Sequence, residues 1–356
     1  MGGHPVSPRV SWQLSPRTRN RLIALLVVLA IAVAGLLYRP PYVILRAGPV
    51  FDTLGTTDGH DLVRVTGIPT YPTTGTLDLT TVAQYGGPGF EITTWDLLAA
   101  FLDPGAEIRR RDELYPPDTT RQQVQERTAA QMAGSQHNAA AVALRAIGKP
   151  EQAVVAQVLA DGPAAGRLHA DDIVLAVNGT AVTRASQVSS LIQEGGSTAT
   201  LRVRRSGQEI DVAVPTRIDQ GRRMVGIGLE AKFDDSIDVA IDAGNVGGPS
   251  AGMMFALAVY DKVTPGPLTG GQKIAGTGTV GIDGAVGPIG GITHKLVGAA
   301  DAGATWFLAP AADCAEVVGN IPDGLQVAKV ATFDEARQAV EQIGAGQGDR
   351  VPTCTP

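Results

Sequence analysis

One uncharged and almost wholly aliphatic run, at residues 22–38, constrains this chain more than any other feature of its sequence. As a helix the run would extend roughly 25 Å, which barely crosses a bilayer. We therefore expect a single N-terminal transmembrane helix over 22–38. A cleaved signal peptide is the alternative, because AVA at 32–34 fits a small-residue cleavage pattern. The apolar run continues through GLLY, which favours a retained anchor.

Basic residues are distributed unevenly around this run. Four arginines precede it and two follow it: Arg9, Arg17, Arg19 and Arg21, then Arg39 and Arg46. Because cytoplasmic flanks carry the excess of Lys and Arg, the distribution predicts a cytoplasmic tail over 1–21. The globular part after Tyr38 would then lie outside the cytoplasm, in a single-pass protein of the cell membrane.

Composition excludes several functional classes. With 356 residues and 44% hydrophobic residues, the chain is long enough for two or three cores. A net charge of −6 without a long basic block predicts no nucleic-acid partner. The two cysteines lie far apart, and there is no histidine pair at ligand spacing, so we expect no metal site. In an oxidising exterior Cys314 and Cys354 could form one disulfide, or either could be an inert thiol.

The pattern after the apolar run is that of a mixed α+β protein. Between Pro40 and about Asp103, β-branched stretches separated by Gly, Pro and Asp predict four strands: PYVILRAGPV, DLVRVTGI, TGTLDLTTVAQY and FEITTW. Segment 119–147 predicts one or two helices that end at Gly148 and Pro150. Two further strands, GIGLEAKF and SIDVAIDAG, are expected after residue 225.

Residues 150–217 have the element order of a small module, in which a strand and a GPAAGRL turn precede ADDIVLAVNG, a helix and two strands. This order resembles a bacterial PDZ domain, whose hallmark includes G-D-x-I-x-x-[IV]-N-G. The matching residues are Asp172, Ile173, Val177, Asn178 and Gly179, with Asp171 where glycine is usual. The resemblance implies that peptide ends dock by strand addition to a sheet edge. Residues 154–159 are candidates for that edge, or for a buried strand, and no GLGF-like tetrapeptide locates the carboxylate loop.

The stretch GNVGGPSAGM, at 244–253, places one serine just before an apolar run. That run, SAGMMFALAVYDKV, predicts a buried helix because it has little polar face. Ser250 would lie at or near the helix N-terminus, where unpaired N–H groups favour developing negative charge. A hydroxyl in this position is placed for acyl transfer beside an oxyanion hole. The alternative is a tight turn that leads into a core helix.

A serine nucleophile needs a base, and histidine is the ordinary choice. The histidines are His4, His60, His137, His169 and His294. His294 is near the serine in the sequence, but it immediately precedes Lys295. Because consecutive helical residues point about 100° apart, we expect one of these two to face inward and the other not.

GGPSAG at 247–252 and GGITHKLVGAADAGA at 290–304 together resemble the proteolytic domain of the Lon family. In that family a serine of [DG]-G-P-S-A-G attacks the peptide carbonyl, and a lysine of P-[IL]-G-G-x-x-x-K takes the serine proton. The resemblance implies Ser250 as nucleophile and Lys295 as general base, with Gly248 supporting the serine loop.

The intervening AGTGTVGIDGAVGPIGG resembles the family's M-T-G-E-x-x-x-x-G-x-V-x-P-[IV]-G-G. The match implies that the Thr277 hydroxyl orients the lysine amine. Thr279 stands where glutamate is usual, and His294 replaces the glutamate before the lysine. A general base must be neutral, whereas a free lysine titrates near ~10.4, so the assignment requires an apolar pocket around Lys295. A surface lysine is the alternative.

The whole chain resembles the membrane-anchored, PDZ-containing Lon-like proteases of bacteria. We expect the PDZ-like module to interrupt one α+β Lon-type proteolytic domain. The expected parts after the anchor are 60–147, the PDZ-like module at 150–217, 225–343 and a tail over 344–356. In the last part, ATWFLAPAADCAEV and KVATFDEARQAVEQI predict strand, helix, strand and helix.

The resemblance implies a serine endopeptidase that cuts peptides or unfolded exported proteins, and a homo-oligomer, plausibly a hexamer. The nearest match to an ATP-binding loop, GPLTGGQKI at 266–274, has Gln272 before the lysine and no Ser or Thr after it. ATP and other cofactors are therefore not expected. The alternatives are a non-catalytic membrane receptor or scaffold that binds peptide ends, and a signal-peptidase-like enzyme with the same dyad chemistry.

Overall fold

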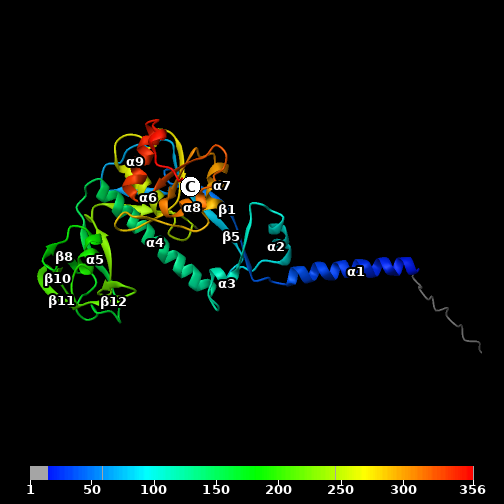
Figure 1. Ribbon diagram of the computed structural model, residues 1–356, viewed down its shortest axis with the longest axis horizontal. Helices are drawn as coiled ribbons and strands as arrows, with labels where there is room; N and C mark the ends of the chain where they lie inside the picture. The colour runs from blue at the N-terminus through cyan, green and yellow to red at the C-terminus, as the bar shows by residue number, and fades with distance from the viewer. Residues whose placement is uncertain (1–14, 58, 245, 356) are drawn as a thin grey trace, which may run out of the picture. The chain divides into compact units, whose positions relative to one another are not determined.

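The computed structural model of the protein describes residues 15–57, 59–244 and 246–355, in two units. The smaller unit reaches Arg46 and resumes from Gln84 to Arg121, and the larger unit comprises Ala47–Ala83 and Gln122–Pro356. Helices and strands are mixed along the chain, so the α+β prediction is confirmed (Figure 1). Arg9, His4 and most of the expected tail over 1–21 lie outside the described residues.

The smaller unit begins with the apolar helix α1. Its elements are α1 (Pro16–Leu37), the first residues of β1 (Tyr42–Asp52), the end of β5 (Thr76–Tyr85), α2 (Thr94–Phe101), β6 (Glu107–Arg110) and α3 (Arg111–Leu114). Helix α1 starts earlier than the apolar run because Ser15 accepts a hydrogen bond from the Thr18 amide and Pro16 occupies the first turn. With a mean hydropathy of 2.4 and no buried residue, α1 is long and apolar enough to cross a membrane.

The strand predicted over FEITTW is wrong. The Thr93 side chain accepts a hydrogen bond from the Asp96 amide, and the Asp96 carboxylate accepts one from the Thr93 amide. This capping box starts helix α2 at Thr94 and overrides the β-branched pattern.

The N-terminal part of β1 pairs antiparallel with β6, from Tyr42 opposite Arg110 to Leu45 opposite Glu107.

A mostly parallel sheet organises the larger unit, with the strand order β20-β19-β16-β5-β1. Strand β16 (Lys273–Gly276) pairs in parallel with β5 and with β19 (Trp306–Pro310), which pairs in parallel with β20 (Gln326–Val330). Helix α6 (Gly252–Val263) is buried along nearly its whole length, as its apolar sequence predicts. The core beside it includes Leu77 and Leu79 of β5, so segments before and after the PDZ-like module share one core.

Shorter elements complete the proteolytic part of this unit. They are β2 (Thr56–Thr57), β3 (His60–Asp61), β4 (Val63–Thr66), α4 (Arg121–Ala146), β15 (Asp238–Ile241), β17 (Thr279–Val280), β18 (Val286–Gly287), α7 (Ile292–Asp301), η1 (Ala311–Asp313), α8 (Cys314–Val317), α9 (Phe333–Gly344) and η2 (Gly348–Arg350). Segment 119–147 therefore forms one helix, α4, of 26 residues. Cys314 and Cys354 form a disulfide that ties α8 to the C-terminal segment.

A second sheet forms the PDZ-like module, with the strand order β11-β10-β8-β7-β14. Its elements are β7 (Gln152–Val158), β8 (Ile173–Val177), β9 (Thr180–Ala181), α5 (Ala185–Gln193), β10 (Thr198–Arg205), β11 (Gln208–Pro215), β12 (Arg217–Asp219), β13 (Arg222–Met224) and β14 (Ile227–Lys232). Asp171 adopts a φ of 67°, in the left-handed region, which explains why glycine is usual at its position.

Of the two alternatives for residues 154–159, the docking edge is wrong, and a strand inside the sheet is what the structure shows. Strand β7 lies inside the sheet, because β8 pairs with one side of it and β14 with the other. The outer strand on this side of the sheet is β14, which the sequence placed in the segment after residue 225. Its long separation from β7 along the chain hides this pairing from local pattern analysis.

Candidate active site

The serine loop is held in place from several sides just before α6. Gly248 adopts a φ of 86°, a conformation that favours glycine. The Ser135 hydroxyl of α4 donates to the Pro249 carbonyl at 3.1 Å, and the Gly278 amide donates to the Ser250 carbonyl at 2.8 Å. A Cβ at Gly252 would lie 2.7 Å from the Ser135 Oγ, so only glycine lets α4 approach the start of α6 this closely.

Three of the sequence-predicted site residues meet at this loop. Lys295 Nζ, from the first turn of α7, lies 2.8 Å from Ser250 Oγ and 2.8 Å from Thr277 Oγ1. The Thr277 hydroxyl in turn donates to the Ser250 carbonyl at 2.9 Å. The structure thus joins the hydroxyl, the amine and the second hydroxyl in one hydrogen-bonded group.

Lys295 is buried, with 2% of its surface exposed, and this burial lowers its pKa to about 8. The nearby Asp313 carboxylate opposes that shift, because a negative charge favours the ammonium form and raises the lysine pKa. Burial also raises the pKa of Asp313, whose carboxylate accepts a hydrogen bond from the Ile289 amide at 3.0 Å. At pH 7 about a tenth of the Lys295 amine is therefore uncharged.

The sequence analysis missed Asp313, and nothing in the motif around it points to the site. The expectation that only one of His294 and Lys295 faces inward is also wrong, because both are buried. Ile292, Leu296 and Ala299 are buried as well, so α7 is covered on most of its circumference rather than along one stripe.

A cavity of about 580 Å³ opens beside Ser250 and Lys295 in the larger unit. Its other lining residues include Phe51, Val82, Ala243 and Val246, which give it apolar walls. A second cavity of about 340 Å³ lies against Ser250 and contains Thr279 in its wall. Ser250 therefore lines two cavities, one on each side of the serine loop.

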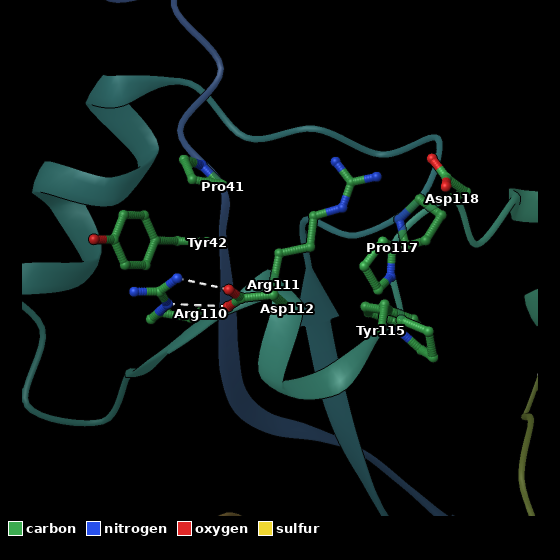
Figure 2. Close-up of a pocket in the computed structure, with 10 residues that line it drawn as sticks. Pro41, Tyr42, Arg110, Arg111, Asp112, Tyr115, Pro117 and Asp118 are labelled. Carbon is green, nitrogen blue, oxygen red and sulfur yellow. Dashed lines mark hydrogen bonds and ion pairs between the residues drawn. The ribbon is translucent and has the colours of Figure 1, made fainter.

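A separate pocket in the smaller unit carries no such constellation (Figure 2). It is lined by Pro41, Tyr42, Pro88, Arg110, Arg111, Asp112, Tyr115, Pro116, Pro117 and Asp118. Arg110 forms an ion pair with Asp112 at 2.6 Å, whereas the guanidinium of Arg111 points away from this pair. None of the sequence-predicted site residues lines this pocket. Within the described ranges, no group of three or more His, Cys, Asp or Glu side chains could hold a metal ion.

Comparison with protein families assigns two regions of the chain. The family model of the Lon protease (S16) C-terminal proteolytic domain matches residues 210–342, and a PDZ domain model matches residues 154–205. The chain contains a Lon-type proteolytic domain and a PDZ domain. The Lon match covers Gly248, Ser250, Thr277 and Lys295, and the matched range begins inside the PDZ sheet, at β11.

Curated relatives include several bacterial Lon proteases. Lon protease 2 of Herpetosiphon aurantiacus is 35% identical over 116 residues, which are 31% of this chain and 14% of that protein. Lon protease of Clostridioides difficile is 38% identical over 101 residues, 27% of this chain and 13% of that protein. The chain therefore covers only a small part of the length of these relatives. Among solved structures, the PDZ domain of an SdrC-like protein from Listeria innocua matches 22% of this chain and 92% of its own, with 22% identity and a TM-score of 0.21.

Proposed function

We propose that this protein is a membrane-anchored, ATP-independent serine endopeptidase with a Ser250–Lys295 dyad. The observation that carries the proposal is the 2.8 Å approach of a buried lysine amine to the serine hydroxyl. Because burial lowers the lysine pKa to about 8, the neutral amine can accept the serine proton near neutral pH.

The reaction proceeds through an acyl-enzyme. As Ser250 Oγ attacks the peptide carbonyl, its proton moves to Lys295 Nζ, and the carbonyl oxygen gains the negative charge. The candidate donors for that charge are the backbone N–H groups of Ser250 and Ala251, just before α6, because those of Gly252 and Met253 already donate to the Pro249 and Gly278 carbonyls. The C–N bond then breaks as the lysine ammonium returns the proton to the leaving amine. Water, deprotonated by the same amine, hydrolyses the ester and restores the serine.

Thr277 is proposed as a positioning residue. Its hydroxyl donates to the Ser250 carbonyl and accepts from Lys295 Nζ, so it fixes the lysine and the serine backbone relative to each other. Gly248 is proposed to give the serine loop its turn, through the positive φ that other residues rarely adopt.

The PDZ domain is proposed to dock peptide ends along β14. One side of β14 pairs with β7, and the other carries no strand among the described residues. An extended peptide added to an open edge satisfies backbone hydrogen bonds, and α5 supplies the neighbouring wall. At the start of the strand, Gly226 has a φ of 78°, and a Cβ there would lie 2.8 Å from Gly162 Cα. We therefore place the candidate docking strand at Ile227–Lys232.

Anchoring and export are proposed from two independent features. Helix α1 is apolar enough to span a bilayer, and the disulfide between Cys314 and Cys354 is typical of an oxidising compartment outside the cytoplasm. The substrates would then be extended or unfolded exported proteins, since stable domains need work to open. Assembly into a homo-oligomer remains part of the proposal, and the mass of the detergent-solubilised protein tests it.

Cleavage of an unfolded protein by the full chain, without nucleotide, tests the function. We expect wild-type protein to cut and the variants Ser250→Ala and Lys295→Ala to be inactive. Ser197→Ala, at an exposed position outside α5 and β14, is the matched control and should remain active. Cleavage that survives both dyad substitutions would exclude the mechanism, and a strict ATP requirement would exclude the ATP-independent reading. Peptide binding without any cleavage would support the scaffold alternative instead.

A further inference from the structure

Helix α2 of the smaller unit carries apolar side chains in two directions. One side packs into the unit's own core, where Ala100 is buried beside Ile44 and Ile92. The other side is exposed: Leu98 is 48% exposed, and Phe101 and the adjoining Leu102 are 77% and 75% exposed. A helix on the surface of a soluble domain needs only one apolar stripe. The second apolar surface of α2 therefore needs a partner.

Helices α1 and α2 contact each other (Figure 1), and the side chain of Trp95 connects α2 to α1. Its indole Nε1 donates to the Ala32 carbonyl at 3.1 Å. Gly35 makes room for the ring, because a Cβ there would lie 2.6 Å from that nitrogen. Trp95, Leu98 and Leu102 are spaced at three and four residues, so the exposed apolar residues extend from the side of α2 that meets α1.

The contact with α1 sets the depth at which α2 would lie in a bilayer that α1 crosses. Ala32 lies before the end of α1 at Leu37, which places it about 7.5 Å along the helix axis from that end. If α1 crosses a bilayer, α2 lies at the level where headgroups meet acyl chains. Tryptophan is enriched at that level, and interfacial helices bury apolar side chains about 5–10 Å deep there.

We propose that the α2 interfacial face, formed by Leu98, Phe101 and Leu102, is seated in the lipid bilayer interface beside α1. The inference rests on the proposed membrane anchor and adds a second attachment to it. A single helix leaves the unit free to rotate and tilt, whereas a second contact fixes the orientation of the smaller unit on the bilayer.

Site-directed spin labelling of the full chain in phosphatidylcholine vesicles tests the proposal. Both native cysteines are in the disulfide, so Phe101→Cys supplies a thiol for a nitroxide at a highly exposed position. Gln208→Cys, exposed at the start of β11, is the matched control. Collisions of the nitroxide with oxygen, which concentrates in lipid, are compared with those of a water-soluble nickel chelate.

We expect the label at Phe101 to collide more with oxygen and at least several-fold less with the nickel chelate than the label at Gln208. Equal access of the chelate to both labels, in protein that sediments with the vesicles, would overturn the proposal that the α2 interfacial face lies in the lipid. The membrane anchor would then still stand. Protein that stays in the supernatant would overturn both. Protection from both reagents with spin–spin broadening would identify a second copy of the chain as the partner and also overturn the proposal.

Discussion

Replacement of Asp313 by asparagine is expected to move the pH profile of peptide cleavage to lower pH. The Asp313 carboxylate raises the pKa of Lys295, against the larger effect of burial that lowers it to about 8. Asparagine removes the negative charge but keeps an oxygen that can accept the hydrogen bond from the Ile289 amide. The substitution should therefore change the lysine pKa with little change in the loop.

The size of the effect follows from the fraction of neutral amine. With a pKa of about 8, roughly half of Lys295 is neutral at pH 8, about a tenth at pH 7 and about a hundredth at pH 6. An unshifted lysine would be about 200-fold less available at pH 7. In the wild type, kcat/KM should thus rise about tenfold per pH unit up to about pH 8 and then level off. In Asp313→Asn, each full unit of downward shift raises kcat/KM at pH 6 about tenfold.

The assay measures kcat/KM for a fluorogenic unfolded substrate between pH 6 and 10, with the full chain in detergent. Asp323→Asn, at an exposed position, removes the same charge and is the matched control. A rise of kcat/KM in Asp313→Asn at the same pH as in the wild type, or at higher pH, would contradict this explanation. So would a wild-type rise centred near pH 6.5, where an ordinary histidine titrates.

Three further outcomes are expected. Lys295→Met should raise the free energy of unfolding by up to about 3 kcal/mol below pH 8, and the gain should fade as the pH rises to about 10.4. Between these two pH values the unfolded lysine still binds a proton that the folded lysine has lost. Urea unfolding at pH 7 and pH 10 measures the difference. Thr277→Val should lower kcat about 10- to 100-fold with little change in KM. Thr305→Val, at an exposed position, is the control and should leave kcat unchanged. An unchanged kcat in Thr277→Val would contradict the role of Thr277 in the site. The Cys314→Ser/Cys354→Ser variant should lose about 4 kcal/mol, because the bond closes a loop with a separation of 40 residues; an equal melting temperature in oxidised wild type and variant would contradict this.

Local patterns in the sequence predicted much of the candidate site. Local pattern placed Ser250 at the start of a helix, and the resemblance to Lon-family motifs implied Lys295 and Thr277 as its partners. The structure brings all three within hydrogen-bond distance. Local patterns also predicted the buried helix α6, because an apolar run without a polar face has no other stable environment in water. They failed at FEITTW, where one capping box outweighs strand propensity.

Other features depend on residues far apart in the chain. The pKa of Lys295 depends first on burial and then on Asp313, the last residue of η1, which the fold brings near α7. The sheet edge next to β7 belongs to β14, because β7 pairs with β8 on one side and with β14, a strand far from it in the sequence, on the other. Burial of both His294 and Lys295 depends on how many elements surround α7.

The sequence by itself determined the apolar helix and the α+β pattern, since each depends on residue type at short spacing. Motifs that resemble two known families indicated the domain types and the candidate nucleophile and base. Only the tertiary structure decided the lowered pKa of Lys295, the outer position of β14 in its sheet and the pairing of the cysteines. Burial, electrostatic fields and sheet edges are properties of neighbours in space, and chain folding rather than local spacing selects those neighbours.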